Sequence, residues 1–173
     1  LRTGLNHKHR IYAEGGQGGF MFGIGANYNG TTGVMKGSDR ESYGGNLDII
    51  YRVNKLKFQN QFTASYTTSS NPLVPFSTYA STNPYYKKTD ENGEITPWLE
   101  YSDFAKASNP LYNASLNSRN GNSSLLLSNY FIAEYSPIES VRLRARMGLT
   151  HTNSDAENFV SPLDTRYTNV DAT

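Results

Sequence analysis

The sequence YGGNLDIIYRVNKLKFQNQFTASY, residues 43–66, decides the fold. Apolar and polar side chains alternate on both sides of Asn54-Lys55, which is the pattern of two half-buried β-strands. A two-residue turn there predicts the following cross-strand pairs: Val53 with Leu56, Tyr51 with Phe58, Leu47 with Phe62, and Tyr43 with Tyr66. Because apolar side chains meet apolar side chains, the stretch predicts an antiparallel hairpin with one apolar face.

The same alternation continues on both sides of this hairpin. Residues 20–29 and 141–150 alternate cleanly, and residues 125–135 and 9–14 do so less regularly. With a turn around residues 136–140, the extended register predicts these further pairs: Tyr28 with Tyr43, Ile24 with Leu47, Phe22 with Ile49, Tyr135 with Val141, and Phe131 with Ala145. We therefore predict an all-β fold, an antiparallel sheet of about six long strands within residues 7–67 and 124–152.

The lengths of the connections differ between the two ends of this sheet. The turns near residues 15–19, 54–55 and 136–140 are short and fall at one end. The other end carries a long loop of about residues 68–123, and residues 153–173 are predicted to begin another loop. Short turns opposite long loops are typical of outer-membrane barrels, whose long loops are extracellular. The sequence thus favours a piece of a large transmembrane β-barrel.

Composition limits the classes of function. The 173 residues carry a formal net charge of +1, which gives no electrostatic case for nucleic-acid binding. Without cysteine there is no disulfide, thiol nucleophile or Cys-ligated metal. The apolar runs are far shorter than the ~20 residues of a membrane-spanning helix, and no nucleophile-elbow motif is present, so neither a helical membrane protein nor an enzyme is predicted. The missing initiator Met and signal segment suggest a fragment.

A soluble β-sandwich, serving as a carbohydrate-binding or adhesive module, remains the alternative. Such a sandwich also alternates apolar and polar residues. Three features favour the membrane barrel: strands longer than the usual five or six residues, tyrosines near the strand ends, and the arginines Arg142, Arg144 and Arg146 on the polar face.

Several segments resemble SusC/RagA-type TonB-linked outer-membrane transporters of the Bacteroidetes. They are GVMKGSDR at 33–40, FSTYA at 76–80, NPYY at 83–86, NPLYNASLNSR at 109–119 and LRARMG at 143–148. The resemblance implies that residues 1–173 belong to the early part of a 22-stranded barrel around a plug, in the bacterial outer membrane. It also implies import of glycans or peptides with a SusD-like surface lipoprotein, driven by TonB through a plug that lies outside this segment. No cofactor is implied.

The two faces of the predicted sheet define the first set of candidate residues. The apolar face is expected to meet the lipid bilayer, because unsatisfied polar groups are costly in hydrocarbon. The polar face is expected to line the barrel lumen, and its candidate residues are Asp48, Gln59, Gln61, Arg142 and Arg144.

The long loop supplies the second set of candidates. It holds eight aromatic residues, enough to form their own packed cluster: Phe76, Tyr79, Tyr85, Tyr86, Trp98, Tyr101, Phe104 and Tyr112. Local packing explains most of them, but we expect Tyr85, Tyr86 and Trp98 to contact a ligand or partner. Amphipathic rings of this kind bind sugars and form interface hot spots.

Two polar motifs contain residue types that bind metal ions. His7 and His9 lie on one side of a strand but have no identifiable third ligand, so ordinary strand-end histidines are expected. The acidic stretch at 90–94 lacks the spacing of a calcium loop and contains Asn92-Gly93, which favours a solvated turn. No metal site is therefore predicted.

Overall fold

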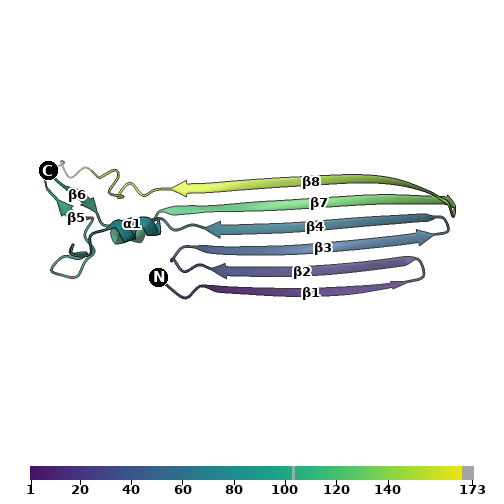
Figure 1. The fold of residues 1–173 in the computed structure, drawn as a ribbon, viewed down its shortest axis with the longest axis horizontal. Coiled ribbons are helices and arrows are strands. Elements are labelled where there is room, and N and C mark those ends of the chain that lie inside the picture. The colour runs from purple at the N-terminus through teal and green to yellow at the C-terminus, as the bar shows by residue number, and fades with distance from the viewer. Residues whose placement is uncertain (103, 169–173) are drawn as a thin grey trace.

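The computed structural model describes residues 1–102 and 104–168. Six long strands form one antiparallel sheet in the order β1-β2-β3-β4-β7-β8 (Figure 1). They are β1 (Leu5–Gln17), β2 (Phe20–Thr32), β3 (Asp39–Val53), β4 (Leu56–Ser70), β7 (Arg119–Ile138) and β8 (Val141–Phe159). The long loop contains α1 (Phe76–Ser81), β5 (Trp98–Tyr101), β6 (Lys106–Ser108) and α2 (Pro110–Ser115). The predicted all-β class and six-stranded antiparallel sheet are confirmed.

The β3–β4 hairpin has the predicted register. The structure pairs Val53 with Leu56, Tyr51 with Phe58, Leu47 with Phe62, and Tyr43 with Tyr66. Asn54 begins the two-residue turn with φ of 49°, a left-handed conformation that Asn adopts more readily than most residues. The β2–β3 pairs are also confirmed: Tyr28 with Tyr43, Ile24 with Leu47, and Phe22 with Ile49.

The predicted register of the β7–β8 hairpin is wrong by two residues. Tyr135 pairs with Leu143 and Phe131 with Met147, because β7 continues to Ile138 before it turns. An irregularity between Tyr135 and Ile138 holds Ser136 and Pro137, and Pro137 has no N–H to donate to the ladder. Ser136 instead donates its backbone N–H to the Lys55 carbonyl at 2.9 Å, which ties this bulge to the β3–β4 turn.

The strands also run further into the loop end than the alternating pattern indicated. Arg119 pairs with Phe159, so β8 continues as a strand where a loop was expected from residue 153. The added part of β7 and β8 is polar on both faces and therefore lacks apolar alternation. Hydrogen bonds such as the one between the Ser124 and Ser154 hydroxyls, at 3.0 Å, join its strands.

The short connections lie at one end of the sheet and the longer ones at the other end, as predicted. Two-residue turns at 18–19, 54–55 and 139–140 lie at one end, the short-turn end (Figure 1). Residues 33–38 and the long loop lie at the other end, the loop end, where α1, β5 and β6 gather.

The large sheet is a single open layer without a core of its own. Among the described residues Val74 is the one buried hydrophobic side chain, and it lies in the loop. On the apolar face Ile24 is 53% exposed and Met147 is 67% exposed. The sheet is not closed, since β1 and β8 form its two edges. Neither described helix is long and apolar enough to cross a membrane.

The turn at Asn54 offers a test of the register. Asn54→Gly keeps the left-handed conformation accessible, whereas Asn54→Val places a β-branched residue there at a cost of about 1–2 kcal/mol. We expect the free energy of unfolding, from urea titration in detergent micelles, to fall by that amount for the valine variant only. Equal stability of both variants would contradict the turn geometry.

Candidate functional site

Two rows of aromatic side chains cross the apolar face. Tyr28, Tyr43 and Tyr66 are direct neighbours toward the loop end, and the rings of Tyr28 and Tyr43 are 4.9 Å apart. Toward the short-turn end, the register aligns a second row: Phe20, Tyr51 and Phe58. Most side chains in the interval are apolar, and the exceptions Asn60 and Asn129 hydrogen-bond to each other at 3.1 Å and 3.2 Å. We call this region the apolar band.

The height of the apolar band follows from the register. Eight residues separate Tyr43 from Tyr51, about 26 Å along a strand at ~3.3 Å per residue. One more row outward, at Val53, Leu56 and Leu143, extends it to about 33 Å along the strand, or about 25 Å in height for a ~40° tilt.

Polar groups begin directly beyond the tyrosine row. The Glu41 carboxylate accepts hydrogen bonds from the Tyr43 hydroxyl at 2.9 Å and from the Tyr28 hydroxyl at 3.4 Å. The rings of His7 and His9 lie 5.4 Å and 6.3 Å from that of Tyr28. Within residues 1–102 and 104–168 no three His, Cys, Asp or Glu side chains are grouped to hold a metal ion. His9 lies opposite Tyr28 and extends the aromatic row onto β1, and His7 lies two residues further toward the loop end.

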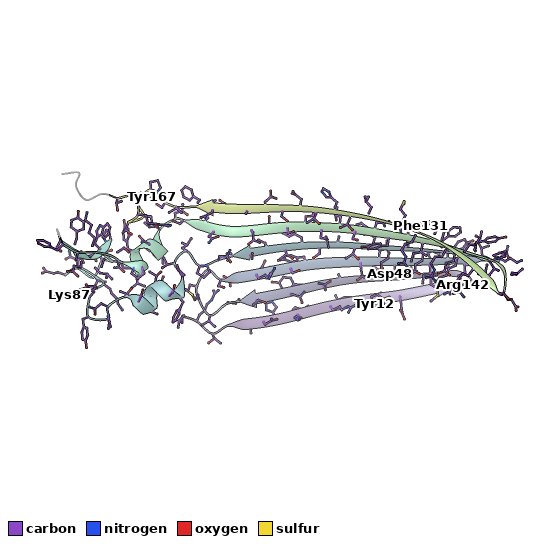
Figure 2. The ribbon with its side chains drawn as sticks, turned by 45° about the horizontal axis from the view of Figure 1, so that its top comes forward. Tyr12, Asp48, Lys87, Phe131, Arg142 and Tyr167 are labelled. Carbon is purple, nitrogen blue, oxygen red and sulfur yellow. The ribbon has the colours of Figure 1, made fainter. Side chains whose placement is uncertain are left out.

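The residues predicted to line a lumen share the opposite, polar face. Asp48 is the cross-strand partner of Gln61, and Gln59 lies two positions before Gln61 in β4. Arg144 faces Glu134 across β7 and β8, with Nη2 to Oε1 of 2.9 Å, and Arg142 precedes it on the same face. Figure 2 shows Asp48 and Arg142 toward the short-turn end, far from Lys87 in the loop. The five candidates thus lie on one face.

Two tyrosines on the polar face were not foreseen. The ring of Tyr12 lies across Gly23 and Gly25 of β2, so that a Cβ atom on Gly23 would collide with it. Tyr130 lies over Gly148 in the same way, and a Cβ atom there would be 2.8 Å from the ring. Both rings are nearly half exposed. The sequence signal was a glycine paired near an aromatic residue on the neighbouring strand.

One buried side chain organises the long loop. Asn109 is fully buried, and its amide nitrogen donates to the Lys88 carbonyl at 2.9 Å and to the Thr96 carbonyl at 2.8 Å. Its Oδ1 accepts the N–H of Leu111 at 3.1 Å and so caps α2. Asn109 therefore joins three separate parts of the loop.

A second amide joins the loop to the segment after β8. Asn113 donates to the Thr165 hydroxyl at 2.7 Å and accepts the Thr165 N–H at 3.2 Å. Beside it, Arg166 contacts both carboxylate oxygens of the buried Asp164, at 2.9 Å and 3.0 Å. These hydrogen bonds hold the pKa of Asp164 below its ordinary value, so the pair stays charged. Residues 160–168 and the loop thus form one folded cap.

The three candidate contact residues have different surroundings. Tyr86 donates its hydroxyl to the Glu100 carboxylate, which raises the pKa of Tyr86 above its ordinary value. Trp98 lies in β5 with its ring 5.6 Å from that of Tyr101. Tyr85 is 92% exposed, and Phe104, which the sequence did not single out, is fully exposed. The expected cluster of eight aromatics is thus incomplete, because these two rings point into solvent.

The acidic stretch at 90–94 forms the expected turn. The Asp90 carboxylate accepts the N–H groups of Asn92 at 2.9 Å and Glu94 at 2.8 Å. Gly93 adopts φ of 85°, in the left-handed region. These local hydrogen bonds occupy Asp90 in an Asx turn.

No protein-family model matches this sequence, and no curated protein sequence matches it either.

Asn109 offers a test of the loop architecture. Asn109→Leu has a similar volume but removes the amide that donates to the carbonyls of Lys88 and Thr96, at a cost of about 2–4 kcal/mol. We expect trypsin to cleave after Lys87 and Lys88 much faster in this variant. Asn92→Leu, in an exposed turn of the same loop, is the matched control. Equal cleavage rates would show that Asn109 does not hold the loop.

Proposed function

We propose that this chain is part of the wall of an outer-membrane β-barrel, with its apolar face against lipid. The observation that carries the proposal is the apolar band, which runs at one level across neighbouring strands and is bordered by aromatic rows. The band is about 20 Å high between the two aromatic rows and about 25 Å high with the outer row of Val53, Leu56 and Leu143. This is close to the ~25 Å apolar band of such barrels, which aromatic girdles border at both interfaces. An exposed apolar face without a core of its own is consistent with lipid as its covering.

In this proposal the polar face lines the lumen and the loop end is extracellular. The polar face carries Asp48, Gln61 and Arg144, which favour contact with water or with a polar plug. All short turns lie at the opposite end, as in barrels with short periplasmic turns.

The function we propose is import of glycans or peptides by a SusC/RagA-type, TonB-dependent transporter. The resemblance of five segments supports the family, and two of them, 76–80 and 109–119, contribute to α1 and α2 of the cap. The transporter would work with a SusD-like lipoprotein and receive energy from TonB through a plug. Exposed Tyr85 and Phe104 on the cap offer contact surfaces for the lipoprotein or substrate.

The soluble sandwich is less well supported. A sandwich needs a second sheet over the apolar face. The described chain has one large sheet and a two-stranded sheet in the loop. The apolar face stays uncovered by either.

Cysteine labelling in intact outer membranes tests the barrel proposal. In the full-length protein, Leu47→Cys and Phe62→Cys should react about tenfold faster with a lipophilic reagent than with a charged one, because hydrocarbon excludes charge. Asp48 and Gln61 are the sequence neighbours of Leu47 and Phe62, so Asp48→Cys and Gln61→Cys are the matched controls. They should react faster with the charged reagent than with the lipophilic one. The reverse pattern would reject the orientation, and equal reactivity with the charged reagent would favour a water-exposed fold.

The import function has a separate test in the cap. A double variant, Tyr85→Ala with Phe104→Ala, removes the two most exposed rings without touching the Asn109 hydrogen bonds. We expect lipoprotein co-purification or substrate uptake to fall by about tenfold, the loss typical of an aromatic hot spot. Glu91→Ala in the same loop is the control. Wild-type levels of both lipoprotein co-purification and substrate uptake would show that these rings contact neither the lipoprotein nor the substrate.

A further inference from the structure

A group of cations gathers on the polar face at the short-turn end, and we call it the basic cluster. Its members are Arg52 of β3, Lys57 of β4, and Arg142, Arg144 and Arg146 of β8. The register places Arg52 opposite Lys57, and Lys57 opposite Glu134 of β7. Glu134 also faces Arg144, so one carboxylate lies among five cations.

The charges of the basic cluster are mostly not neutralised within the described residues. Glu134 pairs with Arg144 at 2.9 Å, and Arg52 contacts the Met21 sulfur at 3.7 Å. In the part of the chain that the structure describes, no carboxylate lies within 4.0 Å of Arg142 or Arg146. The other acids toward this end are Glu14 of β1, Asp48 of β3 and Glu139 of the β7–β8 turn.

The two unpaired arginines lie on an open edge of the sheet. Among described residues β8 pairs only with β7, and all its residues are exposed. Arg142, Arg144 and Arg146 occupy alternate positions of β8, about 6.6 Å apart, the spacing of same-face residues in any paired strand. Figure 2 shows Arg142 at the short-turn end of the sheet.

We propose that an antiparallel strand of the same barrel wall pairs with the free edge of β8 and places carboxylates opposite Arg142 and Arg146. This inference rests on the proposed barrel. Opposite charges on cross-strand neighbours stabilise a sheet, and Glu134 already does this for Arg144 from the β7 side. The alternating arginines therefore specify both the register and the chemistry of the missing neighbour.

A second copy of this chain fits the edge less well. The carboxylates of β8 belong to Asp155 and Glu157, which are odd-numbered and so lie on the face opposite the arginines. A neighbouring β8 from another copy has no carboxylate on that face. The other edge strand, β1, would bring one carboxylate, Glu14, to the polar face, where the two arginines call for two.

The test uses zero-length coupling in the full-length protein in outer membranes. Arg142→Lys and Arg146→Lys each keep the charge and supply an amine, which a carbodiimide joins to a touching carboxylate as an amide with loss of water. Arg144→Lys is the positive control, because it should couple to Glu134. Arg142→Gln has no amine and is the negative control. Peptide mass spectrometry then identifies the partner residue.

We expect both lysine variants to couple to Asp or Glu of one antiparallel strand, with yields within about threefold of the control, since the cross-strand geometry is the same. Failure of both to couple while Arg144→Lys succeeds would overturn the inference. Coupling to a domain inside the barrel, or to a second copy, would also overturn it. Cysteine labelling at Leu47 and Asp48 in the same membranes tests the barrel proposal by itself. Failure of the barrel proposal can therefore be distinguished from failure of the proposed β8 partner strand.

Discussion

The whole sheet depends on the hydrogen-bonded register of its antiparallel ladder. A slip of one residue in any strand would move every side chain of that strand to the other face. Asn54 helps to prevent such a slip between β3 and β4, because its left-handed conformation closes a two-residue turn. The apolar band and the basic cluster are the two faces of this one ladder, and a slip of one residue would disrupt both.

Sheet and cap are stabilised by different interactions. The sheet has backbone ladders, and among the described residues its apolar side chains are not packed into a core. The cap instead relies on buried amides: Asn109 binds two distant carbonyls, and Asn113 binds Thr165. A substitution in the apolar band therefore acts through the surroundings of the sheet, whereas a substitution of Asn109 acts within the cap.

The sequence predicts the parts of this structure that depend on local pattern. Alternation and a two-residue turn were enough for the β2–β3–β4 registers. They were not enough for β7–β8, where Ser136 binds Lys55 from a distant part of the chain. The role of Asn109 was equally hidden, because its acceptors, Lys88 and Thr96, lie 21 and 13 residues away. The shared polar face was foreseen, but the rings lying over glycines were not.

The overhang of β7 and β8 has a mechanical consequence. Beyond Leu125, each strand continues for six residues, about 20 Å, past the tyrosine row. The cap is attached to the tips of this hairpin and bridged there by Asn113 and Thr165. Because β4 stays paired with β7 as far as Ser70 opposite Gly121, three strands carry the cap, and the cap follows any tilt of this end of the sheet as one unit.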